Sequence, residues 1–305
     1  MASMLAILRT RGNLVTNPVQ HFIRIPSKTV SAGSLRLLTG STRWNSSLPN
    51  VVPIRGRYYN DADNSLSRAM QRSKNPIVKF GRRLNNTSPN VIIWGVIGTN
   101  VSVFLMWQYA ISSYQQFRDV RWLQFMMKHF MVHQDSLTTG RWHNLLTASI
   151  SHKDTTHLGV NMLVLYTMGM GVIEAIGASR FLLLYGASGI ASSLAHIGYQ
   201  KYILPRLQKR ELPPTIGSLG ASGSVMGITT FFACAFPRAT FLVFFVVPMP
   251  AIAVVGLFAA YDIYKASTVT FGTIDSAGHI GGAMYGAAYW FLRVKPMLRA
   301  GRWRL

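Results

Sequence analysis

Residues 220–227, "GASGSVMG", open an apolar run with a serine, Ser222, held between two glycines. Gly220 and Gly223 permit a tight turn around this serine, because glycine has no Cβ to obstruct unusual backbone angles. A lone serine in an apolar run is usually a packing residue. Its meaning therefore depends on whether reactive partners stand at the same depth in other apolar runs.

The composition of the whole chain is that of a membrane protein. Of its 305 residues, 49% are hydrophobic and only 13% are charged, whereas soluble domains carry about 25% charged residues. There is a single cysteine, Cys234, so the chain cannot form an intrachain disulfide.

Six apolar runs are predicted to cross the bilayer, so the expected fold class is an all-α polytopic membrane protein. The runs cover residues 91–111, 158–176, 181–197, 222–236, 241–264 and 279–294. The first has 21 residues without a charge, enough to cross a hydrocarbon layer of about 30 Å. Pro248 and Pro250 interrupt the fifth run, which predicts a re-entrant start instead of one straight helix.

Small residues recur at intervals of four in the fourth and sixth runs. Gly223 and Gly227 form one such pair, while Gly278, Gly282 and Gly286 form two pairs in series. Lipid gives helices no hydrophobic reason to associate, so small residues promote association by allowing close backbone contact. We therefore expect the fourth and sixth helices to pack against each other.

Polar residues of unusual type stand at the start of the second, fourth and sixth runs. His157 and Asn161 begin the second, Ser222 begins the fourth and His279 begins the sixth. Alternate spans cross the membrane in the same direction, so these four residues should share one depth near one face. Ionisable groups within spans are costly and usually mark a functional site.

This set of residues suits nucleophilic acyl transfer. A histidine such as His279 can remove the proton that keeps the Ser222 hydroxyl a weak nucleophile. His157 and Asn161 lie one helical turn apart and could both donate to a developing oxyanion, together with the Ser222 N–H. Asp275, four residues before His279, is expected in a loop. No acidic residue is convincingly placed as a third member, so the pattern predicts a Ser–His dyad.

The combined motifs resemble those of the rhomboid intramembrane serine proteases. The resemblance rests on "GASG" around Ser222, "HLGVN" from His157 and "HIGGAMYG" from His279, and it covers roughly residues 91–294. It implies a six-helix rhomboid bundle. Together with the basic start of the chain, it points to the mitochondrial inner-membrane members of the family, in a fungal-like form.

The resemblance also implies roles for individual residues. Ser222 would be the nucleophile and His279 the general base. The oxyanion would be surrounded by His157, Asn161 and the backbone of Gly220.

Three further residues are expected to support this site. His152 would be a structural or water-ordering neighbour, and Gly223 completes the glycine–serine turn. Met226 stands one turn after the nucleophile, where many rhomboids have a tyrosine that stacks on the catalytic histidine. A thioether can also contact an imidazole ring.

The start of the chain has the composition of a mitochondrial presequence. Eight arginines and lysines and seven serines precede the first acidic residue, Asp61, a pattern typical of transit peptides. A basic nucleic-acid-binding arm is the alternative, but it would need interleaved aromatic residues. The predicted organisation is a cleaved presequence at 1–60, a polar linker at 61–90, the six-span protease domain at 91–294 and a basic tail at 295–305.

These observations predict an intramembrane serine endopeptidase of the mitochondrial inner membrane, needing no metal or other cofactor and binding no nucleic acid. Its partners would be the lipid bilayer and single-span membrane proteins, cleaved in or near their transmembrane helix. By resemblance, they include an inner-membrane dynamin-like GTPase and intermembrane-space precursors. A catalytically inactive rhomboid-like membrane chaperone is one alternative. A polytopic transporter is another, although such a protein should contain an internal repeat and the sequence has none.

Overall fold

The computed structural model describes residues 75–207, 217–243, 246–268 and 275–301, all of which belong to one compact unit. The predicted presequence at 1–60 lies outside the described residues. The elements are α2 (Pro76–Asn85), α3 (Pro89–Phe117), α4 (Arg121–His129), α5 (Asn144–Thr147), η1 (Ala148–Ile150), α6 (Thr155–Ile176), α7 (Ala178–Gly198), η2 (Tyr199–Ile203), α8 (Leu204–Leu207), α9 (Ser222–Ala235), β1 (Thr240–Val243), β2 (Val247–Pro250), α10 (Ala251–Thr268), α11 (Ser276–Tyr289), η3 (Trp290–Val294) and α12 (Lys295–Arg299).

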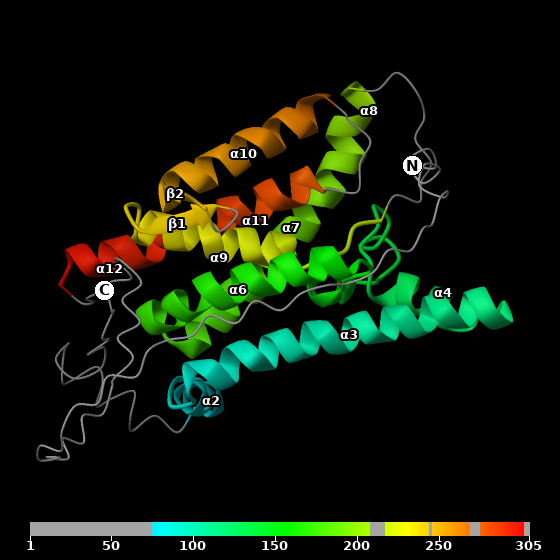
Figure 1. Ribbon diagram of the computed structural model, residues 1–305, viewed down its shortest axis with the longest axis horizontal. Helices are drawn as coiled ribbons and strands as arrows, with labels where there is room; N and C mark the ends of the chain where they lie inside the picture. The colour runs from blue at the N-terminus through cyan, green and yellow to red at the C-terminus, as the bar shows by residue number, and fades with distance from the viewer. Residues whose placement is uncertain (1–74, 208–216, 244–245, 269–274, 302–305) are drawn as a thin grey trace, which may run out of the picture. The chain divides into compact units, whose positions relative to one another are not determined.

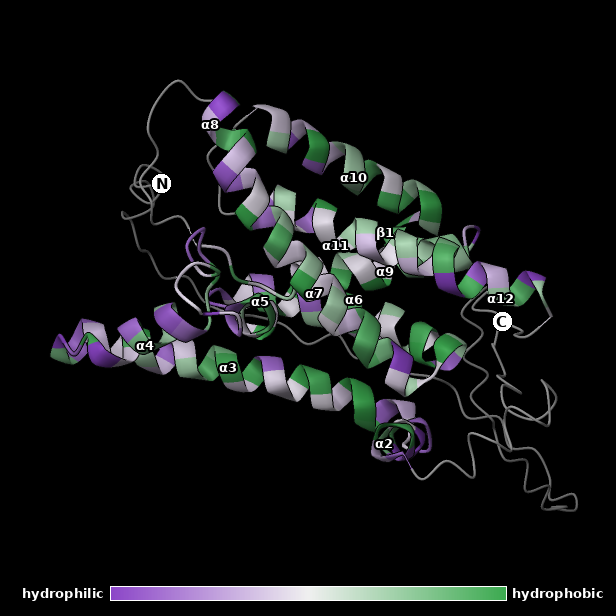
Figure 2. Cartoon of the chain, turned by 180° about the vertical axis from the view of Figure 1, so that it is seen from behind, coloured by the Kyte–Doolittle hydropathy of each residue, from purple (hydrophilic) through white to green (hydrophobic). Residues whose placement is uncertain are grey.

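Three helical segments of the described part are long and apolar enough to cross a membrane. They are Pro89–Phe117, Thr155–Ile176 and Ala178–Leu207, the last of which joins α7, η2 and α8. They contain the first three predicted spans. Figure 2 shows apolar residues along α3 and α6, with hydrophilic residues gathered on α4, α8 and α12.

The fourth predicted span is a shorter helix. α9 runs from Ser222 to Ala235, which is 14 residues and about 21 Å at 1.5 Å per residue. A hydrocarbon layer is about 30 Å thick. α9 is therefore too short to cross such a layer by itself, and Ser222 is its first residue.

A β-hairpin is the one departure from the predicted all-α fold in the described part of the chain. Strands β1 and β2 pair antiparallel, with Thr240 opposite Pro250, and α10 starts only at Ala251. The fifth predicted run is therefore interrupted at its start, as predicted, but the strands before Ala251 form a hairpin where a helical span was expected. Pro248 and Pro250 lack the N–H that a helix or central strand needs, but a strand at a sheet edge tolerates them.

The predicted close packing of the fourth and sixth helices is confirmed. A Cβ added to Gly282 of α11 would collide with the Gly223 carbonyl of α9, and one added to Gly286 would collide with the Gly227 carbonyl. α7 packs against both helices, and its Ser192 fills the space beside Gly223. The two helix backbones are therefore in direct contact.

The apolar core lies on the other side of α9, where it is formed with α3, α6 and α7. Ile93, Leu165, Phe181 and Phe231, one from each of these helices and α9, are completely buried there. α10 packs instead against α11 and α9, away from α3 and α6. The start of α9 is thus held between α6 on one side and α11 on the other.

Candidate active site

The first turns of α6 place two of the predicted site residues. The side chain of Asp154 caps this helix by accepting a hydrogen bond from the His157 N–H at 2.7 Å. Asn161 lies one turn further along and is buried. Its Nδ2 donates to the His157 carbonyl at 2.8 Å, so one of the two amide hydrogens is engaged and the side chain is fixed on the His157 face.

The turn before the candidate nucleophile is held by two hydrogen bonds. The Gly220 N–H donates to the Ala148 carbonyl at 2.9 Å, and the Ala221 N–H donates to His152 Nε2 at 3.2 Å. Gly220 has a φ of +142°, a backbone conformation that residues with a Cβ rarely adopt. Ser222 follows directly as the first residue of α9.

His152 must be neutral to accept that hydrogen bond. Its side chain is completely buried, and this burial, with a smaller contribution from the neighbouring His157 ring, lowers the pKa of His152 to about 3. Because Nε2 accepts from the Ala221 N–H, the proton of the neutral ring belongs on Nδ1. The predicted supporting residue thus fixes the backbone one residue before Ser222.

The backbone of Gly220 was predicted to lie around the oxyanion, and the structure shows where its N–H is engaged. Its N–H is already engaged by Ala148, so this amide is not available to an oxyanion. Its missing side chain matters instead, because a Cβ there would lie 2.8 Å from His157 Cε1 and 3.5 Å from Ser222 Oγ. The His157 ring and the Ser222 hydroxyl therefore converge on the space that Gly220 leaves open.

His279 lies in the first turn of α11, beside the start of α9. A Cβ on Gly223 would be 3.5 Å from the carbonyl oxygen of Gly278, so the residues that follow Ser222 and precede His279 are in contact. The Ser222 hydroxyl makes no hydrogen bond to His279 in the described part of the chain. Such bonds are often long in an enzyme without substrate and tighten in the complex.

A carboxylate that was not among the residues predicted from the sequence contacts His279. The Nδ1 atom of His279 is 3.1 Å from Oδ2 and 3.3 Å from Oδ1 of Asp262 in α10. The signal was available, because Asp262 is an acidic residue inside the fifth apolar run, where a charge is costly and calls for a partner.

Asp275 caps α11 and fastens it to two other segments. Its carboxylate accepts hydrogen bonds from the Gly278 N–H at 2.9 Å and the Ser218 hydroxyl at 2.5 Å, and it pairs with His196 Nδ1 at 2.8 Å. Burial by itself raises the pKa of Asp275, but these three donors outweigh it and hold the pKa below its ordinary value. The predicted loop residue therefore joins the start of α11 to the segment before Ser222 and to α7.

The remaining predicted residue, Met226, is half-buried one turn after Ser222 on α9. Its contact with the imidazole of His279 stays a prediction. Within the described ranges, no group of three or more histidine, cysteine, aspartate or glutamate side chains is arranged to hold a metal ion.

The fold and the site together define a polytopic helical membrane protein in which a serine and two histidines are gathered around the half-buried start of a short helix. Comparison with known proteins agrees with this class. The Rhomboid domain matches residues 139–296, about half of the chain. The chain therefore belongs to the rhomboid family.

Individual relatives are consistent with this membership. Rhomboid protein 1, mitochondrial, of Saccharomyces cerevisiae is 33% identical over 227 residues, which cover 71% of this chain and 60% of that protein. RHOMBOID-like protein 12, mitochondrial, of Arabidopsis thaliana is 31% identical over 72% of this chain and 62% of its own length. Rhomboid protease AarA of Providencia stuartii is 31% identical over 51% and 57%. The chain spans about three fifths of the length of these relatives.

Proposed function

We propose that this chain is an intramembrane serine endopeptidase of the mitochondrial inner membrane. The observation that supports this most directly is the start of α9. There the Ser222 hydroxyl stands at a tightly held turn beside His157 and next to the α11 turn that carries His279. Two of the relatives described above are named as mitochondrial and one as a protease, which agrees with the proposal.

The proposed chemistry is acyl transfer through Ser222. His279 takes the hydroxyl proton while Ser222 Oγ attacks the carbonyl carbon of the scissile peptide, and the protonated imidazole then gives this proton to the leaving amine. Water, activated by the same imidazole, hydrolyses the acyl-enzyme. Each half-reaction returns His279 to its neutral form, so the proposed reaction needs no cofactor to supply or remove protons.

Three donors are proposed for the oxyanion of the tetrahedral intermediate. The Ser222 N–H is in the first turn of α9, where backbone donors have no partner within the helix. The His157 ring and the second amide hydrogen of Asn161 would supply the other two. The Gly220 N–H, engaged by Ala148, is left out of this set.

The proposed substrates are single-span membrane proteins cleaved in or near their transmembrane helix. A hydrogen-bonded helix hides its carbonyls from attack, so helices with small or helix-breaking residues should be preferred. An inner-membrane dynamin-like GTPase and intermembrane-space precursors are proposed examples. Residues 1–60 are proposed to direct import and to be removed.

A fluorophosphonate probe tests the proposed function. We expect it to label the purified protein covalently and to fail with Ser222→Ala, because only an activated serine reacts with the probe. The matched control is Ser224→Ala on the same helix, whose hydroxyl is completely buried and which should keep full labelling. Gel fluorescence measures the result. Equal labelling of Ser222→Ala and the native protein would contradict the assignment, and no labelling of either would favour the inactive chaperone or the transporter.

Replacing Asn161 with alanine is expected to reduce kcat by about tenfold to a hundredfold, with little change in KM. Removal of one oxyanion donor typically costs 10²–10³ in kcat, and here His157 and the Ser222 N–H can carry part of the charge. Steady-state cleavage of a single-span reporter in liposomes measures both constants.

Thr167→Ala is the control for this variant. The Thr167 hydroxyl also donates to the carbonyl of the residue one turn earlier in α6, Leu163 at 2.9 Å, but it is remote from the first turns of the helix. Thr167→Ala should leave kcat unchanged. If Asn161→Ala keeps the native kcat and only lowers the melting temperature, Asn161 is a packing residue.

A further inference from the structure

The contact between His279 and Asp262 joins an imidazole to a buried carboxylate. The side chain of Asp262 is 4% exposed and that of His279 is 18% exposed. The nitrogen involved is Nδ1, which lies 3.1 Å from the nearer carboxylate oxygen. A carboxylate is costly to bury in an apolar environment unless it is paired and hydrogen-bonded. Among the described residues, His279 is the hydrogen-bonding partner of Asp262.

This contact decides which nitrogen of His279 carries the proton. An ionised carboxylate can only accept hydrogen bonds, so Nδ1 must be the donor. In the neutral ring, Nε2 is then unprotonated and has a free lone pair. That is the form of histidine that can take a proton from a serine hydroxyl.

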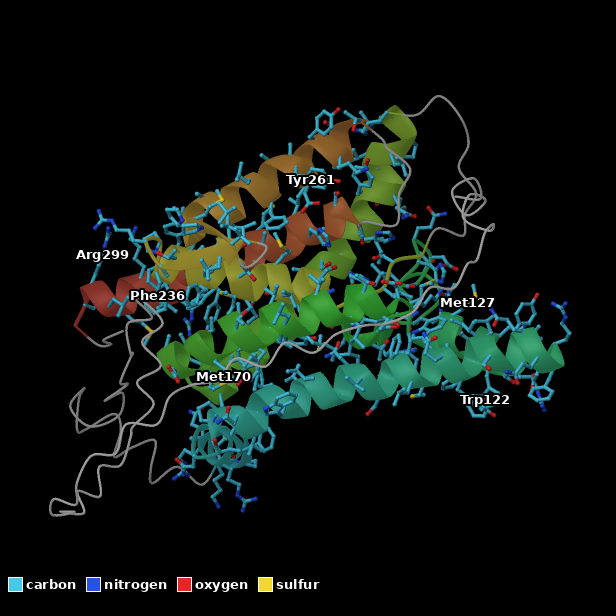
Figure 3. The ribbon with its side chains drawn as sticks, viewed as in Figure 1. Trp122, Met127, Met170, Phe236, Tyr261 and Arg299 are labelled. Atoms are coloured by element: carbon cyan, nitrogen blue, oxygen red, sulfur yellow. The ribbon has the colours of Figure 1, made fainter. Side chains whose placement is uncertain are left out.

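The carboxylate is held in place by the packing of α10. The Tyr199 hydroxyl donates to the carbonyl of Ala266 at 2.6 Å, one turn after Asp262, and so ties this part of α10 to η2, which follows α7. Tyr261, the residue before Asp262, is labelled on α10 in Figure 3. α10 also packs along α11. Both partners of the contact therefore stand on packed helices, which is the arrangement that pre-organises a site.

Helix direction explains why these two residues meet. α10 ends at Thr268 and α11 begins at Ser276, so the two helices pack antiparallel. Asp262 lies six residues before the end of the first, and His279 lies three residues after the start of the second. A residue in the last turns of α10 is therefore level with the first turns of α11.

We propose that Asp262 is a positioning residue of the active site, so that Ser222, His279 and Asp262 act as a triad in place of the predicted dyad. Asp262 holds the His279 ring with Nε2 unprotonated and facing Ser222. It also stabilises the imidazolium that forms when Ser222 loses its proton. This inference rests on the proposed function, because it describes how the same site is arranged.

Asp262→Asn tests the role in catalysis. The amide has the same size but no charge, and its NH₂ group can donate to Nδ1, which favours the wrong form of the ring. We expect kcat to fall by about 10²- to 10⁴-fold, as for loss of the carboxylate in other serine protease triads, while KM changes little. Asp262→Glu, which keeps a carboxylate, should recover part of this loss. Cleavage of a single-span reporter in liposomes gives both constants.

Asp275→Asn is the matched control. It removes a half-buried carboxylate from the same end of α11 and breaks the contacts with Ser218 and His196, but it does not touch the His279 ring. We expect a lower melting temperature with the same protonated nitrogen on His279. A purely structural Asp262 would give the same pattern, a lower melting temperature with kcat preserved in the folded fraction.

A spectroscopic measurement on the native protein does not depend on any variant folding. In ¹⁵N-histidine-labelled protein, with the His279 signals identified by their absence in His279→Ala, the proton of the neutral ring is expected on Nδ1. A proton on Nε2, or an Asp262→Asn enzyme with native kcat, would overturn the inference.

The variants also separate this inference from the proposed function. Cleavage that is lost in Ser222→Ala but kept in Asp262→Asn would leave the proposed function standing. Cleavage independent of Ser222 would refute that function, while the ring measurement would still report on the contact.

Discussion

Alanine at His279 is expected to stop cleavage as completely as alanine at Ser222, with kcat reduced on the order of 10⁶-fold in either variant. The serine hydroxyl is a poor nucleophile without the base, and the base has no reaction to assist without the hydroxyl. The double variant should therefore be no slower than either single variant. The measurement is cleavage of a single-span reporter in liposomes, with a thermal unfolding curve for each variant.

The control for the histidine is His143→Ala. His143 contacts the ring of His129 at the end of α4, with 3.0 Å between the nearest ring nitrogens, and takes no part in the site around Ser222. It should keep native kcat. Additive losses in the double variant, or product formation by folded His279→Ala at the native rate, would exclude His279 as the base for Ser222.

The alignment of the reactive residues could be predicted from the sequence because it depends only on the direction of successive spans. The starts of the second, fourth and sixth apolar runs must fall near one face, and the structure has His157, Ser222 and His279 in the first turns of α6, α9 and α11. The seam between α9 and α11 was also predictable. Glycines four residues apart lie on one helix face, and in lipid such a face mainly serves to pack closely against another helix.

Other features depend on contacts between segments that sequence spacing does not encode. The Gly220 N–H could be expected at the oxyanion, but the fold brings the Ala148 carbonyl against it. The hairpin β1–β2 replaces the expected start of the fifth span, because the backbone at Pro248 and Pro250 is satisfied more easily at a sheet edge than in a helix.

The partner of Asp262 is another feature that the spacing of residues in the sequence does not predict. A carboxylate in an apolar run indicates that a polar or charged partner lies nearby, but several histidines in the sequence could be that partner. His279 is selected because α10 and α11 pack antiparallel, which puts the last turns of one beside the first turns of the other. The choice of partner is thus a property of helix packing, and it becomes visible only in three dimensions.

Gly282→Ala is expected to lower the free energy of unfolding by about 1–3 kcal/mol and to impair cleavage at the same time. The added Cβ would collide with the Gly223 carbonyl, which belongs to the backbone and cannot move aside as a side chain can. Overpacking a close-packed interior typically costs this amount. Because α9 carries Ser222 and α11 carries His279, separation of the two helices also separates the nucleophile from its base. Gly282→Val should be more damaging still.

Gly256→Ala in α10 is the control for this prediction, because it makes the same chemical change where a Cβ would have no heavy atom within 4 Å. There the replacement should stabilise the protein by about 0.5–1 kcal/mol, the usual gain of alanine over glycine inside a helix. The two substitutions are thus expected to have opposite signs, measured as melting temperatures in the same detergent and as kcat in liposomes. If Gly282→Ala were also stabilising, α9 and α11 would have to be further apart than the Gly223–Gly282 contact requires, and that contact could not be what brings Ser222 and His279 together.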